Sequence, residues 1–318
     1  MTKWASAWRV RDVFSCIIAN TKKRGFSTSA QNEKDLRPTE KSFQPIKMAY
    51  ASFESINSVD TSSGTPIIIM HGLLGSKHNW NSLSKVIHNR TKRKVITVDA
   101  RNHGDSPHIP EMSYPHMAED VRQLLIDLNI PRATVVGHSM GGRTMMLLAL
   151  KYPELVKQLI VADISPVRDS PNLKAMPVYL HALSEVKLKP NQTMSAARKE
   201  ADKQLAANVQ ETLLRQFFLT NLVEGENGTF KWKMNLEALT THFNNIASFP
   251  HVDISFNGPT YFIGGSKSDF IKPEDHEKIK RFFPNAVFEY VEGAGHWLHA
   301  EKPTEFLEIL CKFLKMEK

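Results

Sequence analysis

The chain has 318 residues, of which 41% are apolar; this is enough for one large domain or two modest ones, and it excludes disorder along the whole length. Its formal net charge of +8 and pI of about 9.3 suggest a nucleic-acid or anionic-membrane partner. No apolar run approaches the roughly 18 to 20 residues of a membrane-spanning helix, so we expect no transmembrane segment.

The first 26 residues carry most of the charge surplus. They hold six Lys or Arg and the single acid Asp12, a surplus of five, which leaves three for the other 292 residues. A basic, Ser- and Thr-containing segment with few acids and one apolar helical face is typical of a mitochondrial transit peptide, with processing expected near Phe26. We therefore predict a transit peptide over residues 1–26 and a matrix location, with a disordered basic tail as the alternative.

The cysteines and the remaining charge agree with this prediction. Cys16 belongs to the predicted transit peptide, and Cys311 alone cannot form an intramolecular disulfide, so the mature chain needs no oxidising compartment. Its small charge surplus and the lack of any recognition motif exclude nucleic acid as the partner.

Residues 27–45 are polar and contain prolines, which predicts a flexible leader. Beyond it, short apolar strands alternate with amphipathic helices. We predict strands near residues 48–53, 67–70, 95–98, 133–136 and 159–162, and helices near 80–87, 117–128 and 141–152. Alternation with short connections indicates an α/β fold, with a mostly parallel sheet and helices on both faces.

The alternation stops between residues 166 and 250, where apolar residues recur at helical spacing. Strands resume at 259–263 and 286–291, and a helix over 304–314 closes the chain. A long insert between consecutive strands often covers a site. The predicted organisation is a first core part over residues 46–165, an inserted helical cap over 166–250 and a second core part over 251–318.

A nucleophile elbow is predicted at Gly137-His138-Ser139-Met140-Gly141. This G-x-S-x-G string follows an apolar strand directly and opens a helix. A Cβ two residues before or after the serine would clash in so tight a turn, which explains both glycines. Ser139 is therefore the candidate nucleophile.

A serine hydroxyl needs a base to accept its proton. In this arrangement the base comes from the loop after the last strand, where His296 stands in Glu292-Gly293-Ala294-Gly295-His296. Two neighbouring histidines are expected to play no part: His138 is predicted to point away along the turn, and His299 to be a surface residue. No H-E-x-x-H or Cys-His spacing occurs, so we expect no metal and no cofactor.

Acyl transfer also needs donors for the oxyanion. The backbone N–H of Met140, at the start of the helix after the elbow, is one candidate. The second is the N–H of Leu73 in His71-Gly72-Leu73-Leu74-Gly75, directly after a buried strand.

Three carboxylates could orient His296, since all lie between the serine and the histidine in the chain. Asp163 ends the strand that follows the elbow helix, Asp269 lies in a loop beyond the next strand, and Glu237 lies in the cap. We favour Asp163 because a residue at a strand end is rigidly placed.

Five motifs together resemble a known family. From about residue 46 to its end the chain resembles the α/β-hydrolases, and within them the family of the α/β-hydrolase domain-containing protein 11 esterases and their bacterial relatives. The motifs are His71–Ser76, Asp99–Ser106, Gly137–Gly142, Asp163–Pro166 and Gly295–Trp297, in family order and spacing.

The resemblance implies a nucleophile at Ser139, a base at His296 and, from the bacterial members, an acid at Asp163. Some assignments for the animal members place the acid in an N-L-D-A-L segment, where this chain has Glu237. The resemblance also implies a mitochondrial location, hydrolysis of esters and diacylglycerols, and association of the animal members with the 2-oxoglutarate dehydrogenase complex.

The predicted function is hydrolysis of carboxylic esters, with acylglycerols as the expected substrates, through an acyl-enzyme on Ser139. Serine rather than aspartate at the elbow argues against epoxide hydrolases and haloalkane dehalogenases. A thioesterase or amidase on the same triad, and a non-catalytic protective partner of the dehydrogenase complex, stay open as alternatives.

Overall fold

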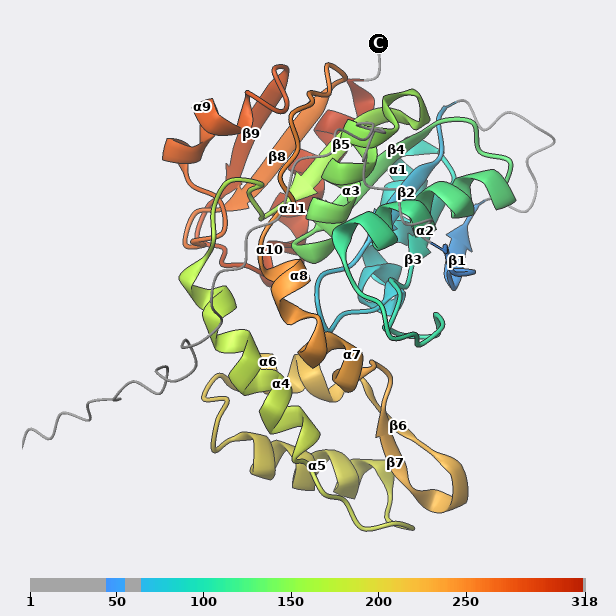
Figure 1. The fold of residues 1–318 in the computed structure, drawn as a ribbon, viewed down its shortest axis with the longest axis vertical. Coiled ribbons are helices and arrows are strands. Elements are labelled where there is room, and N and C mark those ends of the chain that lie inside the picture. The colour runs from blue at the N-terminus through green and yellow to red at the C-terminus, as the bar shows by residue number, and fades with distance from the viewer. Residues whose placement is uncertain (1–43, 55–63, 317–318) are drawn as a thin grey trace, which may run out of the picture. The chain divides into compact units, whose positions relative to one another are not determined.

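The computed structural model describes residues 44–54 and 64–316 (Figure 1). The predicted transit peptide of residues 1–26, and the predicted leader apart from residues 44 and 45, lie outside the described residues.

A seven-stranded sheet in the order β1-β3-β2-β4-β5-β8-β9 forms the centre of the described chain. Edge strand β1 is antiparallel to β3, and the other pairings within this sheet are parallel, which confirms the predicted α/β fold. The strands are β1 (Tyr50–Phe53), β2 (Ile67–Met70), β3 (Val95–Val98), β4 (Ala133–His138), β5 (Val156–Ala162), β8 (Thr260–Gly265) and β9 (Ala286–Val291).

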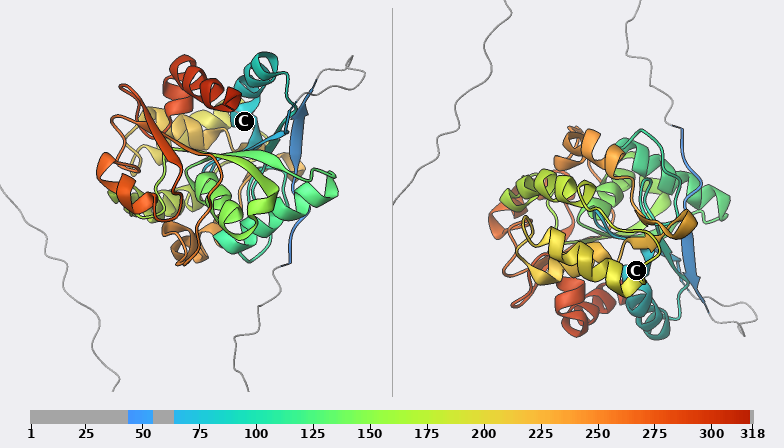
Figure 2. Two further views of the ribbon diagram at one scale, coloured as in Figure 1. Left: turned by 90° about the horizontal axis from the view of Figure 1, so that it is seen from above. Right: turned by 90° about the horizontal axis from the view of Figure 1, so that it is seen from below.

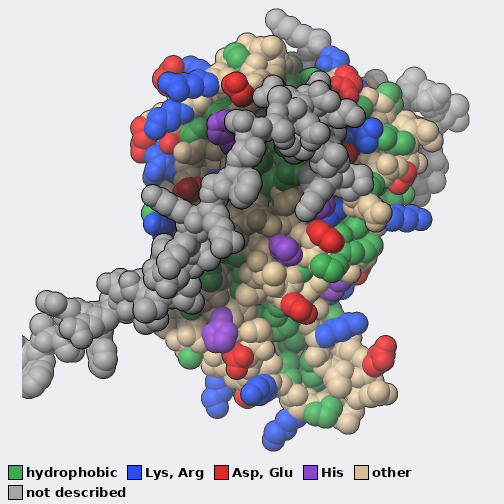
Figure 3. Space-filling view, in the orientation of Figure 1, with side chains coloured by type: hydrophobic (Ala, Val, Ile, Leu, Met, Phe, Trp, Pro, Cys, Tyr) green, Lys and Arg blue, Asp and Glu red, His purple; other side chains and the backbone are tan. Residues whose placement is uncertain are grey.

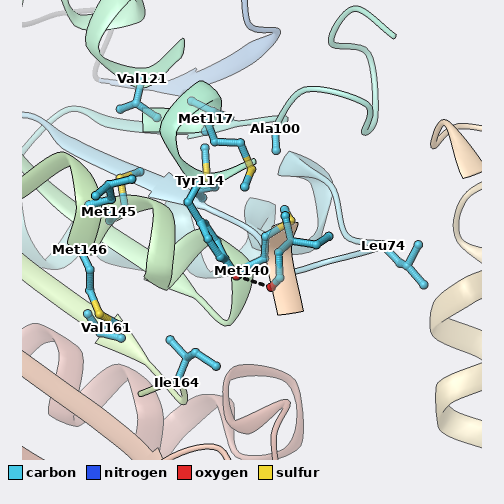
Figure 4. Packing of buried hydrophobic residues seen from close by; sticks show 14 of the residues in the cluster. Leu74, Ala100, Tyr114, Met117, Val121, Met140, Met145, Met146, Val161 and Ile164 are labelled. Atoms are coloured by element: carbon cyan, nitrogen blue, oxygen red, sulfur yellow. Dashed lines mark hydrogen bonds between the residues drawn. The ribbon is translucent and has the colours of Figure 1, made fainter. Parts of the chain in front are cut away.

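Helices cover both faces of the sheet, as the view along it shows (Figure 2). Ile67 and Ile69 of β2 belong to a core that the sheet shares with α1 (Asn81–Thr91) and α11 (Pro303–Lys315). Ile68 and Met70 belong to the core on the other face, with α2 (Tyr114–Asp127) and α3 (Met140–Lys151). Figure 4 shows part of that second core, which includes Met117 of α2 and Met140, Met145 and Met146 of α3. A strand buried on both faces reads as one continuous apolar run, which is why β2 was predictable.

Helix α2 begins three residues before its predicted start. Ser113 caps it by accepting a hydrogen bond from the His116 N–H, and Pro115 lies in the first turn, where its missing N–H costs nothing.

The segment between β5 and β8 lies beyond the carboxyl ends of the strands, below the sheet in Figure 1. It holds α4 (Met176–Ser184), α5 (Met194–Leu205), α6 (Thr212–Leu219), α7 (Leu236–Thr241) and α8 (Phe243–Ala247). It also holds a hairpin of β6 (Leu222–Glu224) and β7 (Phe230–Trp232), which the helical prediction missed. The signal was Asn227-Gly228, because both residues have the positive φ that hairpin turns favour.

Two short helices complete the core: α9 (His276–Ile279) precedes β9, and α10 (Leu298–Glu301) follows it. No helix within the described ranges is long and apolar enough to cross a membrane. On the face seen in Figure 3, basic and acidic side chains are interspersed rather than gathered into one basic patch.

Candidate active site

Ser139 stands between β4 and α3 on a strained backbone. Its φ of 52° and ψ of −118° lie outside the usual region for a residue with a side chain. A Cβ on Gly137 would lie 2.3 Å from the carbonyl oxygen of Gly141, and one on Gly141 would lie 2.5 Å from that of Met70. The turn therefore tolerates only glycine at both positions and presents the Ser139 hydroxyl at the carboxyl edge of the sheet.

His296 connects Ser139 to Asp163. Its Nε2 lies 3.0 Å from the Ser139 Oγ, and its Nδ1 lies 2.7 Å from Oδ2 of Asp163. The imidazole stacks on the ring of Phe270, with 3.7 Å between centroids. Hydroxyl, imidazole and carboxylate thus form one hydrogen-bonded line, the arrangement that lets a serine lose its proton as it attacks.

The Asp163 carboxylate is fully buried and is held by β8 and the loop that follows. Its Oδ1 accepts the backbone N–H of Gly265 at 2.8 Å, and its Oδ2 accepts the Ser268 hydroxyl as well as the histidine. Because Asp163 directly follows β5, next to the strand that carries Ser139, these donors fix the carboxylate against the sheet.

The other two candidate acids lie elsewhere. Asp269 accepts hydrogen bonds from Ser170 at 2.9 Å and from Asn172 at 3.0 Å, and neither of its oxygens bonds His296. Glu237 is exposed on α7. The structure therefore brings together the serine, the histidine and Asp163, and leaves these two carboxylates out of the line.

The Leu73 N–H is oriented by the carbonyl of its own peptide unit. The Gly72 oxygen accepts both the Nδ1–H of His71, at 2.7 Å, and the Gly75 N–H, at 3.0 Å. In a trans peptide the N–H points the opposite way from the C=O, so the Leu73 N–H is turned away from these donors. A Cβ on Gly72 would lie 3.2 Å from the Ser139 Cβ, so this loop passes close beside the serine.

The neutral form of His71 holds this loop in place. Its Nε2 accepts the Ala100 N–H at 3.1 Å, which leaves the proton on Nδ1, and burial lowers the pKa of the imidazole. On the other side of the serine, Met140 is the first residue of α3, so its N–H has no acceptor within the helix. Both predicted oxyanion donors thus lie next to Ser139, Leu73 in the loop after β2 and Met140 at the start of α3.

His138 was expected to point away from the site, and the structure shows that this was wrong. Its Nε2–H donates to the backbone carbonyl of His296 at 2.8 Å, so it anchors the loop that carries the base. Burial, and then repulsion from His299 and His296, holds the pKa of His138 well below its usual value. At neutral pH the imidazole of His138 therefore carries no charge.

His299 is not a surface residue either. It is 7% exposed and stacks on Trp80 with 4.6 Å between ring centroids, and burial lowers its pKa to about 3. Glu301, further along α10, is a third contact that the sequence did not reveal. Its carboxylate accepts the N–H groups of Gly295, at 2.8 Å, and Trp297, at 3.2 Å, on either side of the base.

A cavity of about 640 Å³ opens onto Ser139 and His296. Its wall on the side of the inserted segment is largely apolar and includes Leu173, Met176, Tyr179, Leu213, Leu214 and Phe217. An apolar cavity with a few convergent polar groups suits an acyl chain whose carbonyl is held at the polar end. Among the residues that the structure describes, no group of three or more His, Cys, Asp or Glu is placed to hold a metal ion.

Comparison with known proteins gives consistent matches. A family model described as alpha/beta hydrolase fold matches residues 65–303. The sn-1-specific diacylglycerol lipase ABHD11 of Mus musculus is 42% identical over 99% of this chain and 100% of its own, and that of Xenopus laevis is 45% identical over 79% and 80%. Among solved structures, a marine microorganism esterase is 37% identical with a TM-score of 0.75, and the match covers 84% of this chain and 99% of that one.

Proposed function

Because the chain belongs to the alpha/beta hydrolase family, we propose that it is a serine hydrolase that cleaves carboxylic esters on Ser139. The observation that carries the proposal is the line from the Ser139 hydroxyl through His296 to the buried carboxylate of Asp163. Geometry of this kind is what converts a weak hydroxyl nucleophile into an effective one.

The mechanism is a two-step acyl transfer. His296 takes the Ser139 proton as the oxygen attacks the ester carbonyl, and Asp163 stabilises the imidazolium that forms. The N–H groups of Leu73 and Met140 donate to the oxyanion. His296 then gives its proton to the departing alcohol. His296 next takes a proton from the water that attacks the acyl-enzyme, and it returns this proton to the Ser139 oxygen as the acyl C–O bond breaks and the carboxylic acid leaves.

Acylglycerols are the substrates that we propose. The apolar wall of the cavity is suited to bind an acyl chain. Relatives that match most of this protein bear the name sn-1-specific diacylglycerol lipase. A diacylglycerol with different acyl chains at its two positions tests this, because the released acid reports the position cleaved. The proposal predicts release of the sn-1 chain, and a preference for thioesters or amides of the same acid would contradict it.

The matched control is Ser139→Ala. Removing the nucleophile should lower ester turnover by at least about 10⁴-fold, while the thermal unfolding temperature stays close to that of the wild type. Turnover by the alanine variant near the wild-type rate would refute Ser139 as the nucleophile.

Residues 166–250 form the cap in this proposal, between core parts 46–165 and 251–318. Residues 1–26 act as a mitochondrial transit peptide, ahead of a leader over residues 27–45; the basic, acid-poor composition of the first segment supports this. Import of the full chain into isolated mitochondria tests the address: the product should be shortened by about the first 26 residues, and a chain lacking them should stay outside.

Association with the 2-oxoglutarate dehydrogenase complex is part of the proposal, on the family resemblance alone. Co-purification of the complex with the full chain from mitochondria tests it. If catalysis is what the complex requires, Ser139→Ala will bind it but fail to restore a null phenotype; rescue by that variant would indicate a protective role without catalysis.

A further inference from the structure

Asn221 joins the inserted segment to the loop that carries the Leu73 N–H. It follows α6 and is 2% exposed, and its side-chain Nδ2–H donates to the carbonyl oxygen of Leu74 at 2.8 Å. A polar side chain from the segment between β5 and β8 is therefore buried directly against the loop after β2.

This contact continues through two peptide units. The Leu74 carbonyl shares its peptide with the Gly75 N–H, which donates to the Gly72 carbonyl at 3.0 Å. The Gly72 carbonyl in turn shares its peptide with the Leu73 N–H. We call this series the peptide relay: the Asn221 amide, the Leu74–Gly75 peptide and the Gly72–Leu73 peptide.

All donors of the peptide relay point the same way. Since N–H and C=O are antiparallel in each trans peptide, a hydrogen bond accepted at one end fixes and polarises the N–H at the other. Hydrogen bonds in such a chain strengthen one another. The series ends on the Leu73 N–H, the group that faces the developing oxyanion in the proposed reaction.

We propose that Asn221 is a positioning residue for the oxyanion hole, acting on the Leu73 N–H through the peptide relay. The inference rests on the proposed ester hydrolysis, because only a reaction with an oxyanion makes the direction of that N–H matter. Asn221 touches no reacting atom.

The conformation of Leu74 shows why the loop needs such a contact. Leu74 has a φ of 60°, in the left-handed region that a residue with a side chain rarely occupies. Its N–H donates to Nε2 of His103 at 3.1 Å, and its carbonyl accepts Asn221. Burial lowers the pKa of His103 to about 3, which keeps Nε2 an acceptor. Without Asn221, the Leu74 backbone keeps its bond to His103 but loses the one that its carbonyl accepts.

The position of Asn221 also makes the oxyanion hole depend on the inserted segment. Helix α6, which Asn221 follows, supplies Leu213, Leu214 and Phe217 to the cavity wall. The loop is fully held only when α6 is docked, so the element that contacts an acyl chain also completes the site for its carbonyl.

The test compares Asn221→Leu, which keeps the volume without the donor, with Thr220→Ala as the control. Thr220 is the neighbouring residue, and its hydroxyl donates to Phe217 rather than to the loop. For each purified full-length protein, active sites are counted by fluorophosphonate titration. We then measure kcat per active site and KM for p-nitrophenyl butyrate. We also measure the Ki of a trifluoromethyl ketone, an inhibitor that places an oxyanion in the hole.

We expect Asn221→Leu to lower kcat per active site about 10-fold with KM nearly unchanged, and to raise the ketone Ki by the same factor; deleting a direct oxyanion donor costs more, about 10²- to 10³-fold. Thr220→Ala should match the wild type. Asn221→Ala gives the same readout if the leucine variant does not fold.

An Asn221 variant with wild-type kcat per active site and wild-type ketone Ki would overturn the inference. A purely structural role would lower the fraction of active sites and the unfolding temperature but leave both of those values unchanged. If Asn221 variants keep wild-type kcat and ketone Ki while Ser139→Ala is inactive, only the role of the peptide relay is refuted. If Ser139→Ala itself keeps its activity, the proposed function has failed.

Discussion

The two sides of the cavity are built differently. Ser139 and Asp163 directly follow β4 and β5, neighbouring parallel strands of the central sheet, and each has positive φ that surrounding backbone contacts hold in place. The opposite wall comes from α4 and α6, which belong to a long insert and present apolar side chains. The sheet thus places the nucleophile and the acid, and the insert shapes the wall for the acyl chain; Asn221 is the contact through which we propose that the insert also acts on the oxyanion hole.

The largest effect is expected on the sheet side, from Asp163→Asn. An amide in this position would present an N–H to Nδ1 of His296 and favour the wrong tautomer, so kcat should fall by about 10³- to 10⁴-fold while folding is kept. Steady-state kinetics with a soluble ester measures this.

Asp269→Asn and Glu237→Gln are the matched controls, because neither carboxylate bonds His296. Both should stay within about twofold of the wild type, because neither carboxylate belongs to the hydrogen-bonded line of Ser139, His296 and Asp163. If one of these control variants lost most of its activity while Asp163→Asn stayed active, the carboxylate changed in that control would be the triad acid.

The sequence alone could not decide which carboxylate orients His296. The alternation of strands and helices, the elbow and the position of His296 follow from local patterns: an apolar run, a G-x-S-x-G turn, a loop after the last strand. Which of three carboxylates reaches the histidine depends on the Gly265 N–H and the Ser268 hydroxyl, over 100 positions further along the chain, which no local pattern brings into view. The contact of His138 with the His296 carbonyl, 158 positions further along the chain, was missed for the same reason.

The next effect concerns the contacts that connect the inserted segment to the core. Arg143 of α3 is 1% exposed and donates to the carbonyls of Ser165 and Arg168, where the insert begins, and of Ala247, near its end. Arg143→Met leaves these buried oxygens without their donor and should lower the free energy of unfolding by about 3 kcal/mol.

Urea unfolding measures this loss. Arg122→Met serves as the control, because Arg122 is a partly exposed residue of α2 paired with Glu119, and a change within about 0.5 kcal/mol is expected there. Equal stability of the two variants would show that Arg143 does not tie the insert to the core.

The smallest effect is expected on the apolar wall, from Phe217→Ala. Losing part of the surface that covers an acyl chain should raise KM for an eight-carbon ester about 10-fold. Turnover of an acetate ester, which is too short to reach the wall, should hardly change. Kinetics across a series of p-nitrophenyl esters gives both values.

Val178→Ala is the control for this change, since Val178 lies on α4, is 51% exposed and does not line the cavity. If Phe217→Ala lowered the turnover of short and long esters equally, the division between a sheet that does the chemistry and an insert that selects the chain would be wrong.

The most direct test of the central claim is to map the residue that a fluorophosphonate modifies. The reagent phosphonylates a serine only where a base and an oxyanion hole activate it. Peptide mass spectrometry of the labelled full chain should find one adduct, on Ser139, which disappears in Ser139→Ala and is formed far more slowly in Asp163→Asn. An adduct on another residue, or none on the active folded protein, would contradict the account.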